Sequence, residues 1–205
     1  MTSNLDNLRA GTDSIEFFVW IDPKSATAAH NLKLTGKFFS VPLADPSKLL
    51  PFLPNPNYKD VFVSPFSSGL MRPYVAEYNL ELARSAKFSS YPSRLNAIFL
   101  LSSREEAEKY RERNPDHVGR RILKTARTCG HYVLSEHDSN WIEFLRLDHS
   151  LDEETTTLVS EAYWRGLNVE STSLMSRGTA WTARPIREVL YHGQIEFADR
   201  SLETL

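Results

Sequence analysis

A hydrophobic run lies between Leu95 and Leu101, directly after a polar cluster, and six of its seven residues are apolar. Two serines, Ser102 and Ser103, follow the run. Its short length and polar flanks favour a buried strand over a helix. Arg94 directly precedes the run, so we expect its guanidinium at the mouth of the strand. There it would meet either a structural carboxylate or the phosphate of a ligand.

Other segments also have the composition of strands. The segment 15–21 is rich in aromatic and β-branched residues and ends at Asp22-Pro23, which is typical of a strand followed by a turn. Near the C-terminus, Ile195 and Phe197 alternate with polar residues. The predicted strands are 15–21, 95–101, 120–128, 131–135 and 186–197, with 120–128 joined to 131–135 near Cys129-Gly130 and the last divided into two pieces around His192-Gly193.

Two helices are predicted from their first residues. Pro73 suits the first position of a helix, and Tyr74, Tyr78 and Leu82 then recur every four residues, which predicts a helix to about Lys87. The sequence Ser103-Arg104-Glu105-Glu106 has the pattern of a capping box, which predicts a helix over residues 105–113.

Two more helices are predicted in the second half of the chain. Asp138 or Ser139 is expected to cap a short helix that carries Trp141. Asp152 is expected to cap another helix, which Gly166 ends. The buried stripe of this second helix is predicted to contain Leu158, Val159, Ala162 and Tyr163.

The remaining segments are predicted to be irregular. Five prolines between residues 42 and 57 exclude long regular structure and predict an ordered loop with one helical turn over 48–52. A short strand is predicted at 61–63 and a turn at 64–69, and the segment 171–182 is predicted to be a polar loop. Strands scattered among unequal helices, without a regular strand-helix-strand order, predict an α+β fold. We expect a single domain over 15–205 behind a flexible polar lead-in, residues 1–14.

Composition narrows the function classes. The formal net charge is −2, which disfavours a protein that binds mainly to the phosphate backbone of nucleic acid. The single cysteine excludes an internal disulfide and a zinc site built from several cysteines. None of the eight glycines forms a phosphate-binding loop, which disfavours kinases, P-loop enzymes and Rossmann dehydrogenases. We expect no metal.

The same sequence gives expectations about location. No run of about eighteen apolar residues is present, so no membrane span is expected. Residues 1–14 lack the pattern of a secretory signal. We therefore expect a soluble protein that is either cytoplasmic or exported as an effector by a route without a signal peptide.

Each candidate catalytic residue can also be explained by a structural role. Ser135, His137 and Asp138 are the residue types of a catalytic triad, but neighbours on one chain point apart, so a hydrolase is disfavoured. Glu188 directly precedes the strand Val189-Leu190-Tyr191. It is either a carboxylate at the rim of the core or an exposed glutamate that pairs with a nearby arginine. Its spacing from the arginines favours the exposed glutamate. Aromatic pairs such as Tyr163-Trp164 at the end of a helix are more often packed in the core than exposed for stacking on the ring of a ligand.

Three of these motifs, in this order, resemble the ADP-ribosyltransferase fold. They are Ser93-Arg94 before the strand to Leu101, Tyr163-Trp164-Arg165-Gly166 at a helix end, and Glu188-Val189-Leu190-Tyr191-His192-Gly193 near the C-terminus. The resemblance covers about residues 72–198 and matches small uncharacterised members of that family. It implies a split antiparallel β-sheet core flanked by short helices, with NAD in the cleft between two sheets.

The resemblance also implies roles for individual residues. Glu188 would be the catalytic carboxylate that stabilises positive charge on the ribose. Arg94 would hold the pyrophosphate with Ser93 as an added donor, and Tyr91 or Trp164 would stack on the nicotinamide ring. The implied reaction transfers ADP-ribose from NAD to a protein, nucleic-acid or small acceptor, as in bacterial toxins and effectors.

The match departs from the family at two places. The expected first strand, 15–21, carries no arginine or histidine to meet NAD, and Ile186 stands where arginine-modifying relatives often carry Glu or Gln. Two alternatives stay open at this point. One is a non-catalytic module that binds a nucleotide, a peptide or a nucleic acid in the same cleft, and the other is a structural or immunity-type protein in which Arg94 serves only ion pairs.

Overall fold

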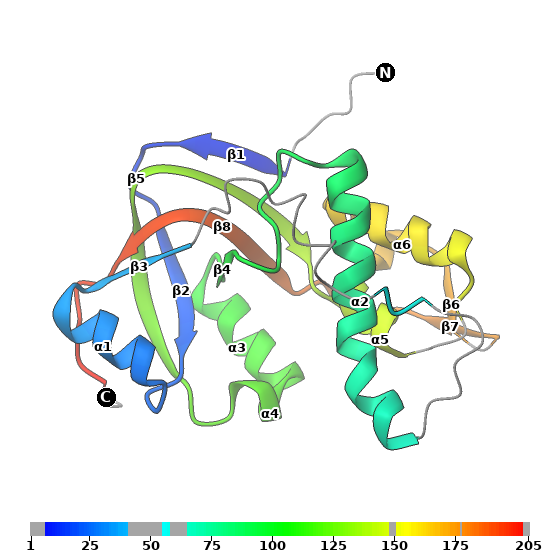
Figure 1. Ribbon diagram of the computed structural model, residues 1–205, viewed down its shortest axis with the longest axis horizontal. Helices are drawn as coiled ribbons and strands as arrows, with labels where there is room; N and C mark the ends of the chain where they lie inside the picture. The colour runs from blue at the N-terminus through cyan, green and yellow to red at the C-terminus, as the bar shows by residue number, and fades with distance from the viewer. Residues whose placement is uncertain (1–6, 41–54, 58–64, 148–150, 177, 203–205) are drawn as a thin grey trace.

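The computed structural model describes residues 7–40, 55–57, 65–147, 151–176 and 178–202, with the backbone alone for residues 65–71. The fold is mixed α+β, with a curled antiparallel sheet at one end and a group of helices at the other (Figure 1). Most of the predicted loop 42–57 and the predicted strand 61–63 fall outside the described residues.

Strands β5 and β8 form the centre of the main sheet. They pair with each other along most of their length, from Arg127↔Glu196 to Asp138↔Arg187. The strands β1 and β2 pair with β5, and β3 and β4 pair with β8. The strands of this sheet are β1 (Leu8–Gly11), β2 (Glu16–Ile21), β3 (Lys37–Phe39), β4 (Ile98–Leu100), β5 (Ile122–Asp138) and β8 (Arg187–Glu196).

The main sheet closes on itself. Following the paired strands from β2 to β5, β8 and β4 leads back to β2, because Phe18 and Leu101 form an isolated antiparallel bridge. The two amide-to-carbonyl distances in this bridge are 2.9 Å and 2.8 Å. Closure leaves fewer free strand edges and encloses a core within the sheet. That core contains buried side chains from all four strands, including Phe17, Leu100, Leu134 and Val189.

The helices build a second core beside the sheet. The long helix α2 packs against α5 and α6 (Figure 1), and Leu80, Trp141, Phe144, Tyr163 and Trp164 are buried between them. A two-stranded hairpin, β6 (Leu174–Ser176) and β7 (Thr179–Trp181), flanks this group. The helices are α1 (Ala26–Leu34), α2 (Pro65–Lys87), α3 (Arg104–Arg113), α4 (Pro115–Val118), α5 (Asn140–Leu147) and α6 (Glu153–Trp164), with a 3-10 turn at Val169–Ser171.

Two predicted helix starts are confirmed by their hydrogen bonds. The hydroxyl of Ser103 accepts from the amide of Glu106 at 3.1 Å, and the carboxylate of Asp152 accepts from the amide of Thr155 at 2.6 Å. Gly166 ends α6 with a φ of +68°, a left-handed conformation that favours glycine. None of the described helices is long and apolar enough to span a bilayer.

The predicted strand 95–101 is shorter than expected. Arg94 to Ala97 form a turn in which the carbonyl of Ser93 accepts from the amides of Asn96 and Ala97, at 3.2 Å and 2.9 Å. Only Ile98–Leu100 pairs with β8, and the Phe99 side chain is 43 % exposed. The apolar run therefore does not mark a strand buried on both faces.

Other boundaries also differ from the sequence prediction. The strands predicted at 120–128 and 131–135 form one long strand, because Gly130, with a φ of +73°, lies at a register shift rather than in a turn. The two pieces predicted for 186–197 are likewise one strand, β8. Helix α2 begins at Pro65, so residues 65–69 of the predicted turn 64–69 are helical. Pro73, predicted to be the first residue of this helix, lies in its interior.

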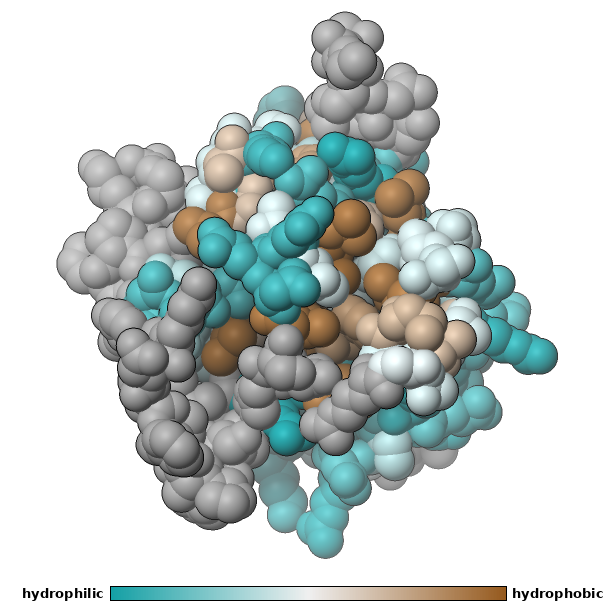
Figure 2. All heavy atoms as spheres, turned by 90° about the vertical axis from the view of Figure 1, so that its right-hand side faces the viewer, coloured by the Kyte–Doolittle hydropathy of each residue, from teal (hydrophilic) through white to brown (hydrophobic). Residues whose placement is uncertain are grey.

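Two predicted irregular segments contain strands. Leu8–Gly11 of the predicted flexible lead-in pairs with β5, and the predicted polar loop 171–182 contains the β6–β7 hairpin. Leu158, predicted to be buried, is 58 % exposed on α6. Figure 2 shows the face beside α2, α6 and the hairpin, where apolar side chains reach the surface between polar ones.

Candidate functional site

A cavity of about 480 Å³ lies where the sheet meets the helices. Residues of α3 and α4 line one side and residues of α2 and α5 line the other, and these pairs of helices face each other in Figure 1. Its volume is within the usual range of small-molecule sites. Its wall contains three carboxylates (Glu77, Glu143 and Glu188), three guanidinium groups (Arg94, Arg121 and Arg146) and the rings of Trp20, Phe99 and Tyr110.

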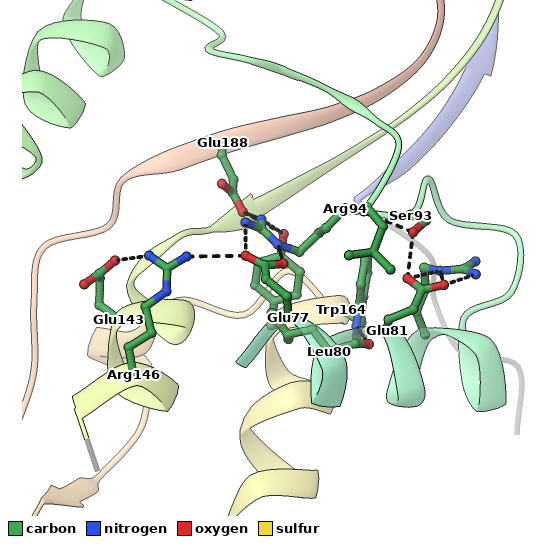
Figure 3. Close-up of polar contacts among 12 residues, drawn as sticks. Glu77, Leu80, Glu81, Ser93, Arg94, Glu143, Arg146, Trp164 and Glu188 are labelled. Atoms are coloured by element: carbon green, nitrogen blue, oxygen red, sulfur yellow. Dashed lines mark hydrogen bonds and ion pairs between the residues drawn. The ribbon is translucent and has the colours of Figure 1, made fainter. Parts of the chain in front are cut away.

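Arg94 is the centre of a buried ion-pair network in this wall (Figure 3). Its guanidinium donates to both carboxylate oxygens of Glu77, at 2.7 Å and 3.1 Å, to the hydroxyl of Tyr163 at 2.8 Å, and to Glu188. Four of its five N–H donors are therefore used within the protein. The pKa of Arg94 lies well above its usual value because its two carboxylate partners outweigh the effect of burial.

Glu188 enters the network from the start of β8. Its carboxylate accepts from Arg94 and, at 2.6 Å, from the hydroxyl of Tyr163. Only 6 % of Glu188 is exposed. Burial raises its pKa, and the attraction of Arg94 and the Tyr163 hydrogen bond offset only part of that rise. The favoured alternative of an exposed glutamate paired with a neighbouring arginine is therefore wrong, because the partner is Arg94 in a distant segment.

The network continues along the helices. Arg146 on α5 donates to Glu77 at 3.4 Å and to Glu143 at 3.0 Å (Figure 3). Burial alone would raise the pKa of Glu77, but Arg94 and Arg146 together hold it below its usual range. Charges of alternating sign thus run from β8 through α2 to α5.

The opposite side of the cavity carries Tyr110, His117 and Arg121. Burial raises the pKa of Tyr110 to about 12, with a smaller contribution from Glu188. The pKa of His117 is lowered by burial and by the nearby positive charges of Arg121 and Arg146. The rings of Tyr110 and His117 meet edge to face, with their centres 5.9 Å apart.

A layer of buried polar residues lies behind Glu188. His137, which pairs with Glu188 across β5 and β8, contacts the hydroxyl of Ser135 at 2.7 Å and the carbonyl of Tyr163 at 2.8 Å. Burial lowers the pKa of His137 to about 3. Ser135 and His137 therefore meet, contrary to the expectation that they point apart, but both are fully buried, while Asp138 accepts from backbone amides elsewhere.

The five predicted site residues separate into two groups. Arg94 and Glu188 meet in the cavity wall, whereas Ser93, Tyr91 and Trp164 are not among the residues that line it. Ser93 donates to Glu81 at 2.7 Å, Tyr91 donates to Asn7 at 2.9 Å, and the indole of Trp164 donates to the Leu80 carbonyl at 2.8 Å.

These positions correct the roles that the resemblance implied. Ser93, Tyr91 and Trp164 are all at most 3 % exposed and make hydrogen bonds inside the core, so they are not placed to contact a ligand. Arg94 has one free N–H donor left, so it is not placed to hold a pyrophosphate with its fork. Its geometry instead positions Glu188.

Several cavity residues were not predicted from the sequence. The missed charged residues are Glu77, Arg121, Glu143 and Arg146, and the missed rings are Trp20, Phe99 and Tyr110. One signal was present: Glu77 and Glu81, four residues apart, lie on a helix beside the fully buried Leu80. Charged residues on the apolar face of a helix indicate buried partners.

The fold and the site together define a class: an α+β protein with a closed antiparallel sheet and a cavity walled by buried ion pairs. A family model described as "Protein of unknown function (DUF2441)" matches residues 52–200, and the chain belongs to this family. The match includes every charged residue of the cavity wall. No curated protein matches the chain.

Proposed function

We propose that this chain is an NAD-dependent mono-ADP-ribosyltransferase that binds NAD in the cavity and uses Glu188 as its catalytic carboxylate. One observation carries the proposal. Arg94 and Glu188, which are 94 positions apart and belong to separate motifs of the resemblance, meet in the wall of one cavity of about 480 Å³. Buried charged groups with shifted pKa values in a cavity are typical of functional sites.

The charges of the wall suit NAD. Its nicotinamide ring is cationic and its diphosphate is anionic, so a site for the whole molecule needs both signs. Three carboxylates and three guanidinium groups provide them. Phe99 and Tyr110 add aromatic surface to the same wall.

The sheet also supports the proposal. Strands β5 and β8 each pair with different partners in their two halves, β1 and β4 at one end and β2 and β3 at the other. The antiparallel pairing is the part of the implied fold that this sheet shares, whereas its six strands form one closed sheet and the cavity lies where that sheet meets the helices.

The proposed reaction replaces one bond to the ribose. The bond from C1′ to the nicotinamide nitrogen breaks, and its electron pair leaves with neutral nicotinamide. An oxygen or nitrogen of the acceptor forms the new bond to C1′, and the proton that it loses passes to solvent. The ionised carboxylate of Glu188 stabilises the positive charge that develops on the ribose, and Arg94 and Tyr163 fix its direction.

The test is release of nicotinamide and transfer of label from NAD to proteins or nucleic acids in a lysate. Glu188→Gln keeps the size of the side chain and a hydrogen-bond acceptor for Arg94 but removes the charge. We expect it to lower both signals by about a hundredfold or more. Glu196→Gln, on the exposed end of the same strand, is the matched control and keeps full activity. Equal activity in Glu188→Gln and in the unchanged protein would refute the proposal.

A second candidate is a non-catalytic module that binds a nucleotide or a peptide in the same cavity. The direct ion pair of Arg94 with Glu188 favours it, because the carboxylate already has two partners. For this candidate we expect NAD or another nucleotide to raise the melting temperature while no nicotinamide is released. Turnover that depends on Glu188 would exclude it.

A further inference from the structure

Two buried guanidinium nitrogens near the cavity have no hydrogen-bond partner in the part of the chain that the structure describes. They are Nη1 of Arg121 and Nε of Arg146. Among the described residues, Arg121 forms no side-chain hydrogen bond or ion pair that would satisfy the rest of its fork. Both residues line the cavity that holds Arg94 and Glu188.

Unsatisfied buried donors of this kind are unusual. A buried charged donor without an acceptor destabilises the folded protein, and most buried polar atoms are paired. Arg94 in the same wall shows the ordinary outcome, with four of its donors bonded to protein acceptors. Arg121 and Arg146 are the two residues with such an unpaired side-chain atom that also line the cavity, so a ligand in the cavity is the candidate acceptor.

The two arginines approach the cavity from different elements. Arg121 lies between α4 and β5, and Arg146 lies on α5. His117 of α4 is close enough to both for their positive charges to lower its pKa. An acceptor between the two arginines would therefore also face His117.

The partners of Arg146 define the chemistry that is still missing. Glu143 and Glu77 accept from its two terminal nitrogens, and Nε remains free. Arg121 has no carboxylate partner among the described residues, so it is the cation of the wall that is not neutralised by direct contact. The fork of a guanidinium matches the geometry of phosphate oxygens.

We propose that Arg121 and Arg146 form a phosphate-binding subsite of the cavity, separate from the Arg94–Glu188 pair. Its ligand class is a phosphate ester or diphosphate whose oxygens accept from Nη1 of Arg121 and Nε of Arg146. The assignment of this phosphate to the diphosphate of NAD rests on the proposed function. Binding of a phosphate by the two arginines does not depend on the proposed function.

The experiment measures binding of inorganic pyrophosphate and of ADP-ribose by isothermal titration calorimetry. The variants are Arg121→Ala, Arg121→Lys and Arg146→Lys, the last two of which keep the charge but change the donors. Arg120→Ala removes the same charge from an exposed neighbour outside the cavity lining and is the matched control. Circular dichroism and melting temperature establish that each variant is folded.

We expect Arg121→Ala to weaken binding of both probes by roughly ten- to a hundredfold, the effect of losing a hydrogen bond between charged groups. Arg121→Lys and Arg146→Lys should weaken binding by smaller factors, and Arg120→Ala should leave it within about twofold, as a screened surface charge does. Unchanged affinity in both Arg121→Ala and Arg146→Lys, or no binding of either probe to the unchanged protein, would overturn the subsite.

Glu188→Gln distinguishes failure of the subsite from failure of the proposed function. If the unchanged protein releases no nicotinamide but binds pyrophosphate through Arg121, the transferase proposal falls and the subsite stands. If nicotinamide release depends on Glu188 while Arg121→Ala keeps both the KM for NAD and the affinity for pyrophosphate, the subsite falls and the transferase proposal stands.

Discussion

At the scale of single residues, the main feature is the number of charges held inside the protein. Glu81 and Arg84 are 1 % and 2 % exposed and pair with each other, and Arg94 and Glu188 form a second pair beside the cavity. Removing one member of a buried pair is costly because the other is left without a partner. Loss of either member of a pair therefore destabilises the folded protein.

Arg94→Ala is expected to lower the free energy of unfolding by about 3–5 kcal/mol, since two carboxylates of the network lose their main partner. Glu188→Gln should cost less, about 1–2 kcal/mol, because the amide oxygen still accepts from Arg94. Urea denaturation measures both values. The surface variant Lys109→Ala serves as a control and leaves stability unchanged. A smaller loss in Arg94→Ala than in Glu188→Gln would contradict the network.

His137 predicts a dependence of stability on pH. Its pKa is lowered to about 3 in the folded protein, so between about pH 6.5 and 3 the unfolded chain binds a proton that the folded protein does not. Stability therefore falls as the pH decreases through this range, by up to about 1.4 kcal/mol per pH unit from this group. In His137→Asn the slope below pH 6.5 should be smaller by that amount, as measured by urea denaturation at several pH values. The unchanged protein, measured at the same pH values, gives the reference slope.

The sequence predicted part of the residue-scale picture. The position of Arg94 before an apolar run indicated a guanidinium that meets a carboxylate or a phosphate, and the structure places it against two carboxylates. Its partners Glu77 and Glu188 are 17 and 94 positions away in the sequence. The choice between a carboxylate and a phosphate partner therefore depended on tertiary structure. Tyr91 and Trp164 were misjudged for the same reason, because aromatic side chains suit a core as well as a ligand site.

At the scale of elements, local signals were sufficient where one side chain decides a boundary. Ser103 and Asp152 begin helices at the predicted places because each cap is completed within three residues. Boundaries that depend on distant partners were not predicted: Leu8–Gly11 is a strand only because β5 lies beside it. Gly130 suggested a turn, but pairing with β8 on both sides of it keeps β5 continuous.

Ser103→Ala tests the contribution of one cap to α3, the helix that carries Tyr110 into the cavity wall. Loss of the hydrogen bond to the Glu106 amide should lower the free energy of unfolding by about 1 kcal/mol. Chemical denaturation measures the change. Ser102→Ala, at the exposed neighbouring position, should have no effect, and an equal loss in both variants would exclude the cap as the cause.

At the scale of the whole molecule, the first described residues join the sheet to the helices. The amide of Asn7 donates to the carbonyls of Glu136 in β5 and Trp164 at the end of α6, and Tyr91 donates to its oxygen. The segment predicted as a lead-in therefore connects both halves of the fold. The α+β class and the helices α3, α5 and α6 followed from sequence patterns, whereas α4 and this connection did not.

Deletion of residues 1–14 is expected to lower the melting temperature by several degrees, because it removes β1 and the hydrogen bonds of the Asn7 side chain to Glu136, Trp164 and Tyr91. Asn7→Ala alone should produce part of this loss, and Asn55→Ala should produce none, since Asn55 is exposed and far from the sheet in sequence. Differential scanning calorimetry measures all three. An unchanged melting temperature after deletion would show that β1 adds nothing to stability.

The position of β8 in the closed sheet has a consequence for synthesis of the chain on the ribosome. β8 is the last strand of the sheet along the chain, yet it pairs with β3, β4 and β5. Among the described residues, β3 and β4 have no neighbour in the sheet until residues 187–196 have left the exit tunnel, apart from the bridge of Leu101 to Phe18. We therefore expect nascent chains stalled before residue 187 to be digested rapidly by protease, and chains with β8 emerged to become resistant together in one step.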